Sequence, residues 1–336
     1  MHTDNTSLKP LQIGELTAEK PIIQGGMGVG VSRSSLAGAV AAEGGIGIIS
    51  TAQIGYDEEG FERDQAGCNR LAISKHIRRA KEIAGGRGLV GVNIMVALKH
   101  YKEHVQEAVK AGADVIISGA GLPMDLPKLV GDSVTKIAPI VSSKRAAQLI
   151  LKMWAHRYER TADFLVIEGP KAGGHLGFSR EQLKDVEALD YDQEIKEIIE
   201  CKKVYEEKFH TKIPVIVAGG IFDRSDIDHA LELGADGVQI ASRFVTTAEC
   251  DAAEEYKQAQ AYLLSAQEVA SEAQKAYQAA QASLQNLLDS YKEKDQSYQV
   301  IDKDYQEAQT KMFDLMDHLK SKEARRQSLE SIQKNH

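Results

Sequence analysis

Short apolar runs recur at regular intervals through residues 1–250 of the chain. They do not alternate apolar with polar positions, and continuous runs of this length are typical of strands buried on both faces of a parallel sheet. Segments with helical periodicity separate them. We predict eight strands, at residues 21–24, 46–50, 89–94, 113–118, 137–141, 164–167, 213–218 and 237–240.

The helices predicted between these strands cover residues 35–43, 75–84, 102–111, 143–156, 192–209 and 225–233. Asp223 supplies a plausible N-cap for the last of them. Eight strands alternating with helices over about 240 residues match the size and rhythm of a (β/α)8 TIM barrel. An open, doubly wound α/β sheet is the rival. We favour the barrel because polar and glycine-rich positions follow the strands, where barrel active sites lie.

A heptad pattern replaces this rhythm in the C-terminal region. Ten successive heptads are typical of a coiled coil, and one helix over residues 254–334 would be about 120 Å long. Lys294 interrupts the apolar seam beside Asp295, which marks a bend if the region is a helical hairpin. The a positions are Tyr256, Leu263, Ala270, Tyr277, Leu284, Tyr291, Tyr298, Tyr305, Met312 and Leu319. The d positions are Ala259, Ala266, Ala273, Ala280, Leu287, Lys294, Ile301, Ala308, Leu315 and Lys322.

Glycine and proline usage supports a division of the chain into two regions. All 28 glycines lie at or before Gly237, and the last proline is Pro214. We therefore predict a barrel domain over residues 1–250 and a helical coiled-coil or hairpin region over residues 251–336.

Composition narrows the class of protein. Lys and Arg total 41 and Asp and Glu total 49, and the resulting formal charge of −8 argues against a general nucleic-acid binder. The cysteines Cys68, Cys201 and Cys250 are far apart and in no metal-ligand spacing, so reduced thiols in a cytoplasmic protein without a metal site are expected. No apolar run approaches the roughly 18 residues of a membrane span, and the first 20 residues lack an apolar signal segment.

Candidate chemistry follows the strands. Glu168 ends the sixth strand, and Gly173, Gly174 and His175 come directly after it. The loops after the last two strands also carry small residues, which let the backbone approach a ligand closely. They are Gly219-Gly220 after the seventh strand and Ala241-Ser242 after the eighth. Either loop alone is explained by a tight turn. Together, their backbone N–H groups predict a phosphate site and hence a phosphorylated cofactor.

Six segments in order resemble one known family. They read PIIQGGMG, GVNIMVA, PIVSS, EGPKAGGHLG, PVIVAGGI and GADGVQIASRF. Over residues 10–256 the chain resembles the nitronate monooxygenases, once called 2-nitropropane dioxygenases, and their relatives the flavin-type enoyl-acyl-carrier-protein reductases. The Gly- and Pro-rich segment that follows in this family is absent, and the heptad region stands in its place.

The resemblance implies a TIM barrel that binds FMN non-covalently. It places His175 beside the flavin, as a base or hydrogen-bonding group for a nitronate. The cofactor-binding residues that it implies are Gly25, Gly26 and Met27 along the isoalloxazine, Asn93 at its polar edge, Ser142 and Glu168 at ring or ribityl groups, Gly173 and Gly174 under the cofactor, and Gly219, Gly220, Ala241 and Ser242 at the phosphate. Gln239, on the eighth strand, is a further cofactor-binding candidate.

Three functions stay open at this level. The first is an FMN-dependent nitronate monooxygenase, a flavoprotein that oxidises alkyl nitronates with O2. The second is an NAD(P)H-dependent flavin reductase of the enoyl-acyl-carrier-protein or quinone reductase type. The third is an impaired barrel that serves as a coiled-coil scaffold. The expected partners are a small-molecule substrate, O2 and NAD(P)H, with no nucleic acid and no membrane, and with self-association into a homo-oligomer through the C-terminal helices.

Overall fold

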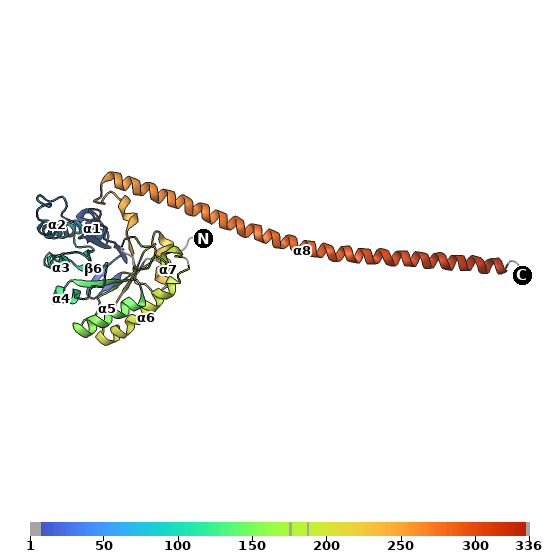
Figure 1. Ribbon diagram of the computed structural model, residues 1–336, viewed down its shortest axis with the longest axis horizontal. Coiled ribbons are helices and arrows are strands. Elements are labelled where there is room, and N and C mark those ends of the chain that lie inside the picture. Colours follow the sequence, from blue (N-terminus) through green and yellow to red (C-terminus); the bar gives the residue numbers. More distant parts are fainter. Residues whose placement is uncertain (1–7, 175–176, 187, 334–336) are drawn as a thin grey trace. The chain divides into compact units, whose positions relative to one another are not determined.

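The computed structural model describes residues 8–174, 177–186 and 188–333. The chain divides into two compact units, with the boundary in the sequence between Leu264 and Ser265. The first unit contains an eight-stranded parallel barrel surrounded by helices (Figure 1). Its strands are β3 (Ile22–Gln24), β4 (Ile46–Ser50), β5 (Leu89–Met95), β6 (Val115–Gly119), β7 (Lys136–Val141), β8 (Leu165–Glu168), β9 (Val215–Ala218) and β10 (Gly237–Ile240).

The sheet closes because its first and last strands pair. β10 lies between β9 and β3, with Gln239 opposite both Ala218 and Ile23. All eight pairings are parallel, and neighbouring strands follow chain order around the ring. The predicted (β/α)8 barrel is confirmed, with every strand within two residues of its expected bounds at each end.

Helices alternate with the strands as predicted, with two differences. The helix α2 begins at Gln65, ten residues before its expected start, because the Asp64 side chain accepts a hydrogen bond from Gly67 N (2.8 Å) and caps it. A short helix after β6, α4, has only five residues and gives too little periodicity to detect. The helices are α1 (Ser34–Ala42), α2 (Gln65–Ala84), α3 (Tyr101–Lys110), α4 (Leu126–Val130), α5 (Lys144–Arg157), α6 (Tyr191–Phe209) and α7 (Arg224–Glu232), with 3-10 turns at Gln182–Lys184 (η1) and Ser242–Thr246 (η2).

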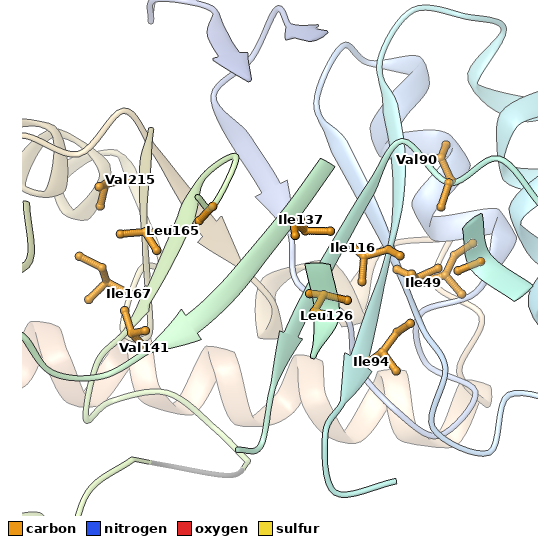
Figure 2. Packing of buried hydrophobic residues seen from close by; sticks show 14 of the residues in the cluster. Ile49, Val90, Ile94, Ile116, Leu126, Ile137, Val141, Leu165, Ile167 and Val215 are labelled. Atoms are coloured by element: carbon orange, nitrogen blue, oxygen red, sulfur yellow. The ribbon is translucent and has the colours of Figure 1, made fainter. Parts of the chain in front are cut away.

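Neighbouring residues of most barrel strands enter two different hydrophobic clusters. Ile48 and Ile117 pack inside the barrel. Their neighbours Ile49 and Ile116 pack against the helices (Figure 2). Burial on both faces explains why the strands read as continuous apolar runs.

An N-terminal hairpin belongs to the inner cluster. Its strands β1 (Leu11–Ile13) and β2 (Leu16–Ala18) pair antiparallel, and Leu11 and Ile13 are buried with Leu89 and Phe164, which lie at the start of β5 and just before β8. The inner cluster thus extends to the amino-terminal end of the barrel, and the carboxyl ends of the strands are left for the functional site. This hairpin was not predicted from the sequence, because its three-residue strands are too short to show hydrophobic periodicity.

The C-terminal region is one helix, α8 (Glu254–Gln333). It stays helical through residues 289–295, so the hairpin alternative is wrong and the long-helix alternative holds. None of the described helices, α8 included, is long and apolar enough to cross a membrane.

Candidate active site

The predicted site residues that the structure describes follow or end the strands of the barrel, so they lie at its carboxyl-terminal end. Backbone hydrogen bonds continue the barrel ladder just beyond the strand ends, from Gly25 N to Ile240 O (2.8 Å) and from Gly169 N to Ala218 O (2.9 Å). The loops after β3 and β8 therefore leave the sheet from fixed positions next to the ends of β10 and β9. The geometry brings the glycine-rich loops onto one rim, as expected of a barrel active site.

Gly26 and Asn93 are in close contact on this rim. A Cβ built on Gly26 would lie only 2.6 Å from the Cβ of Asn93 and 3.1 Å from Ile48 Cγ2. Asn93 is a half-buried residue of β5 that pairs with Ser50 and Ile117. Glycine at residue 26 lets the main chain of the β3 loop lie directly against the Asn93 side chain.

Gln239 lies against the next glycine of the same loop. A Cβ on Gly25 would be 3.2 Å from Gln239 Cγ. The side-chain oxygen Oε1 of Gln239 is buried and has no hydrogen-bond partner among the described residues. A buried amide oxygen without a partner is costly, so this atom points to a ligand donor.

Gln24, whose role was not evident from the sequence, holds the β3 loop in place. Its amide nitrogen donates to Ser32 Oγ (3.0 Å) and Gly25 O (2.5 Å), and its oxygen accepts from Ile48 N (3.1 Å). Ser32 Oγ in turn accepts from Met27 N at 2.9 Å. A glutamine at the end of an otherwise apolar strand was the available signal.

Glu168 and Ser142 are joined through a residue that the sequence did not reveal. The hydroxyl of Tyr191, the first residue of α6, donates to the Glu168 carbonyl oxygen (3.0 Å) and to the Ser142 carbonyl oxygen (3.4 Å). Its ring meets Phe178 edge-on, with the centroids 5.6 Å apart. Burial raises the pKa of Tyr191, so its hydroxyl stays protonated and remains a donor.

The Glu168 carboxyl group is half-buried at the barrel mouth. Burial raises the pKa of Glu168 to about 7, because water solvates the carboxylate form poorly there. A carboxyl group with this pKa can hold or release a proton near neutral pH.

Gly173 and Gly174 extend the β8 loop into solvent. Both are exposed, and Gly174 has φ +96°, a conformation that glycine adopts readily. His175, the predicted catalytic residue, lies outside the described residues.

The two predicted phosphate loops are tied to each other. Arg243, in η2 after β10, donates to Phe222 O after β9 (3.1 Å) and lies 4.5 Å from the centre of the Phe222 ring. Gly219 and Gly220 have φ +91° and +83°. The predicted N-cap of α7 is confirmed, since Asp223 accepts from Ser225 N and Asp226 N. Those helix N–H groups are therefore engaged, which leaves the glycine and η2 segments as the phosphate candidates.

A family model shows where this barrel belongs. The model described as nitronate monooxygenase matches residues 9–333, and the chain is a member of this oxidoreductase family. The match runs through α8, beyond residue 256, where the recognisable motifs end. Members of the family are flavin-dependent, which implies a flavin cofactor here.

Individual relatives are distant. A (3aS,4S,5R,7aS)-5-hydroxy-7a-methyl-1-oxo-octahydro-1H-indene-4-carboxyl-CoA dehydrogenase of Mycobacterium tuberculosis is 25% identical, over 69% of this chain and 54% of its own. The chain thus spans about half the length of that relative. A "probable nitronate monooxygenase" of Staphylococcus aureus is 25% identical, over 71% of this chain and 68% of its own.

Solved structures agree on the fold. FabK from Thermotoga maritima superposes with a TM-score of 0.53 at 27% identity, covering 73% of this chain and 65% of that one. A nitroalkane oxidase from Streptomyces ansochromogenes gives 0.56 at 21% identity, covering 71% and 70%, which supports the barrel fold alone.

Proposed function

We propose that the protein is an FMN-dependent nitronate monooxygenase that oxidises alkyl nitronates with O2. Family membership supports an oxidoreductase with a flavin. The observation that carries the proposal for this site is the buried Gln239 Oε1, which lacks a partner among the described residues and lies beside Gly25 at the barrel mouth. A flavin has a ring N–H that can donate a hydrogen bond to such an oxygen.

The described residues fit a flat, phosphorylated cofactor. Gly25 and Gly26 would let the ring approach the main chain, Met27 would flank it, and Asn93 would meet its polar edge. Backbone N–H groups of Gly219, Gly220, Ala241 and Ser242 would hold the phosphate. Ser142 and Glu168 would lie toward the ring or ribityl chain, and Gly173 and Gly174 beneath it.

When bound, FMN supplies the electron-accepting chemistry of nitronate oxidation and returns the electrons to O2. The protein's part is to orient the substrate and manage protons. His175 would act as the base or hydrogen-bonding group at the nitronate, since histidine titrates near neutral pH. Glu168 would hold a second proton at the rim, at a carboxyl whose pKa is about 7.

An FMN titration followed by anaerobic reduction tests this function. We expect the protein to bind FMN, a nitronate to bleach the flavin absorbance, and O2 to restore it. Gln239→Ala should weaken FMN binding by about tenfold, the cost of one good hydrogen bond. Gln148→Ala, an exposed change on α5, should leave it unaltered. A protein that never takes up FMN would contradict the proposal and favour the scaffold function.

The second candidate is an NAD(P)H-dependent flavin reductase. The similarity to FabK and to a relative named as a dehydrogenase supports this second candidate function. The same experiment separates the two. Bleaching by NADH or NADPH but not by a nitronate would establish the reductase and exclude the monooxygenase.

Two further properties belong to the proposal. The cysteines Cys68, Cys201 and Cys250 are free thiols, which suits a cytoplasmic protein. The protein would also be a homo-oligomer held by its C-terminal helices, since the heptad seam needs a partner to be buried.

A further inference from the structure

The second unit carries an apolar seam that is open to solvent along its length. Tyr277, Leu287 and Tyr298 are 63%, 66% and 67% exposed, and Ile301, Leu315 and Leu319 are 66%, 65% and 62% exposed. These residues occupy the a and d positions of the heptads, so they lie on one face of α8. An exposed stripe of this kind marks a binding surface.

The size of the side chains along the seam changes from one end to the other. Between residues 266 and 280 the seam is mostly alanine, interrupted by Tyr277. Between residues 298 and 319 it is mostly large, interrupted by Ala308. Two copies of the helix that run in opposite directions therefore place small residues opposite large ones.

We propose that α8 pairs with α8 of a second copy of this chain in an antiparallel coiled coil in which residue 266 of one copy faces residue 319 of the other. In antiparallel coiled coils an a residue meets a d residue of the partner, and this register obeys that rule throughout. Five of the eight distinct layers then combine alanine with a large residue. The eight facing pairs are Ala266 with Leu319, Ala270 with Leu315, Ala273 with Met312, Tyr277 with Ala308, Ala280 with Tyr305, Leu284 with Ile301, Leu287 with Tyr298, and Tyr291 with Lys294.

A parallel, in-register pair would fit poorly. Tyr277 would face Tyr277, while Ala273 and Ala280 in the adjacent layers would face alanine. Wide and narrow layers would alternate, so the helices could not keep a constant separation without voids or overpacking. Lys294 would also face Lys294 in the seam. In the antiparallel pair Lys294 lies against Tyr291, whose ring can accept a cation.

The size of the seam suits a stable dimer. Residues 266–319 contain sixteen a and d positions, and flanking e residues such as Leu288 and Met316 add to the contact. Standard interfaces use roughly 20–30 residues a side. Because the register maps residues 266–319 onto themselves, both copies use the same residues, as a two-fold symmetric dimer requires.

Sedimentation equilibrium of the full chain and cysteine cross-linking test the pairing together. We expect a species of twice 36.7 kDa. A variant with both Tyr277→Cys and Ala308→Cys should cross-link into covalent dimers, and peptide mapping should find residue 277 joined to residue 308. Each single variant should give no dimer through its new cysteine. Links of 277 to 277 and 308 to 308 would show a parallel pair and overturn the proposal.

A size swap tests the register independently. Ala280→Tyr makes the layer too large, and Tyr305→Ala leaves a void, so each should raise the dimer Kd by at least about tenfold. The variant with both changes restores one large and one small residue and should regain most of the affinity. Ala282→Tyr is a matched control at an f position, away from the seam, and should leave the Kd unchanged. A monomer at every concentration, a larger oligomer, or no recovery in the double variant would each overturn the proposal.

Discussion

The main chain of Gly26 is packed so closely against the side chain of Asn93 that a Cβ at residue 26 would lie 2.6 Å from the Asn93 Cβ. Real Cβ atoms do not approach each other this closely, so Gly26→Ala must displace Asn93 or the β3 loop. We expect a loss of about 1–3 kcal/mol in the free energy of unfolding, as for other overpacking changes. FMN affinity should fall by at least about tenfold, because the displaced groups line the proposed flavin site. Denaturant unfolding and an FMN titration measure the two effects.

Gly45→Ala is the matched control. Gly45 lies next to β4 at the opposite end of the barrel, where a Cβ would be 3.0 Å from Ile22 O. It should lower stability without a specific loss of FMN affinity. Equal FMN affinities in wild type and Gly26→Ala would contradict the placement of the flavin against this loop.

Glu168 should make stability depend on pH. Its pKa rises from 4.5 to about 7 in the folded protein, so folding favours the protonated form. This contribution is fully present below about pH 4.5 and is lost as the pH rises through 7. Relative to Glu168→Gln, the wild type should therefore lose stability between pH 5 and 8. The loss should be on the order of 1–2 kcal/mol, since partial exposure screens the group.

Unfolding by denaturant at a series of pH values measures this difference. Glu62→Gln, a change at an exposed glutamate on the β4 loop, serves as the control. The stability difference between wild type and this variant should not show the same change between pH 5 and 8. If the difference between wild type and Glu168→Gln is flat across pH 5–8, the carboxyl group does not titrate near neutrality.

Tyr191→Phe should loosen the rim between β7 and β8. The change removes the hydroxyl that donates to the carbonyl oxygens of Glu168 and Ser142. Leaving these carbonyls without that donor should cost about 1–2 kcal/mol of stability. Tyr158→Phe deletes a hydroxyl that donates to Asp125 in an exposed position (2.7 Å), and should cost less than about 0.5 kcal/mol. A cost no greater for Tyr191→Phe than for Tyr158→Phe would show that the hydrogen bonds of the Tyr191 hydroxyl do not stabilise the fold.

The barrel was predictable because its strands carry a strong local signal. Residues such as Ile48 and Ile49 are apolar side by side, as expected of a short strand buried on both faces. The hairpin at Leu11–Ala18 was not predictable, because each strand has three residues and its burial depends on the distant Leu89 and Phe164. The sequence left a continuous helix and a hairpin open for the C-terminal region, because one charge in a seam, Lys294, is compatible with a bend or with a straight helix.

The candidate site likewise contains residues that the sequence indicates and residues that it does not. Glycines and polar residues at strand ends, such as Gly26 and Gln239, could be found from the sequence, because chain order places every strand end on one rim. Tyr191 could not, because it begins a helix and reaches the site only through the packing of α6. The pairing of Gly26 with Asn93 likewise depends on a three-dimensional distance that no local pattern records.

Asp251 should be needed for the stability of the β3 loop and of α1. Arg33, at the N-cap of α1, makes no capping hydrogen bond with its own side chain. The Asp251 carboxylate, far along the chain, accepts from the backbone N–H groups of Arg33 (2.9 Å), Leu36 (3.2 Å) and Ser35 (3.3 Å). A carboxylate here satisfies helix N–H groups and suits the helix dipole.

Asp251→Ala should therefore cost about 1–2 kcal/mol in the free energy of unfolding, with a smaller cost for Asp251→Asn, which keeps an acceptor but not the charge. FMN affinity should fall in parallel, because α1 follows directly from the loop that carries Gly25, Gly26 and Met27. Asp132→Ala, at an exposed loop position, is the control and should change neither quantity. If Asp251→Ala unfolds at the wild-type denaturant midpoint, the three hydrogen bonds contribute nothing net to the stability of α1.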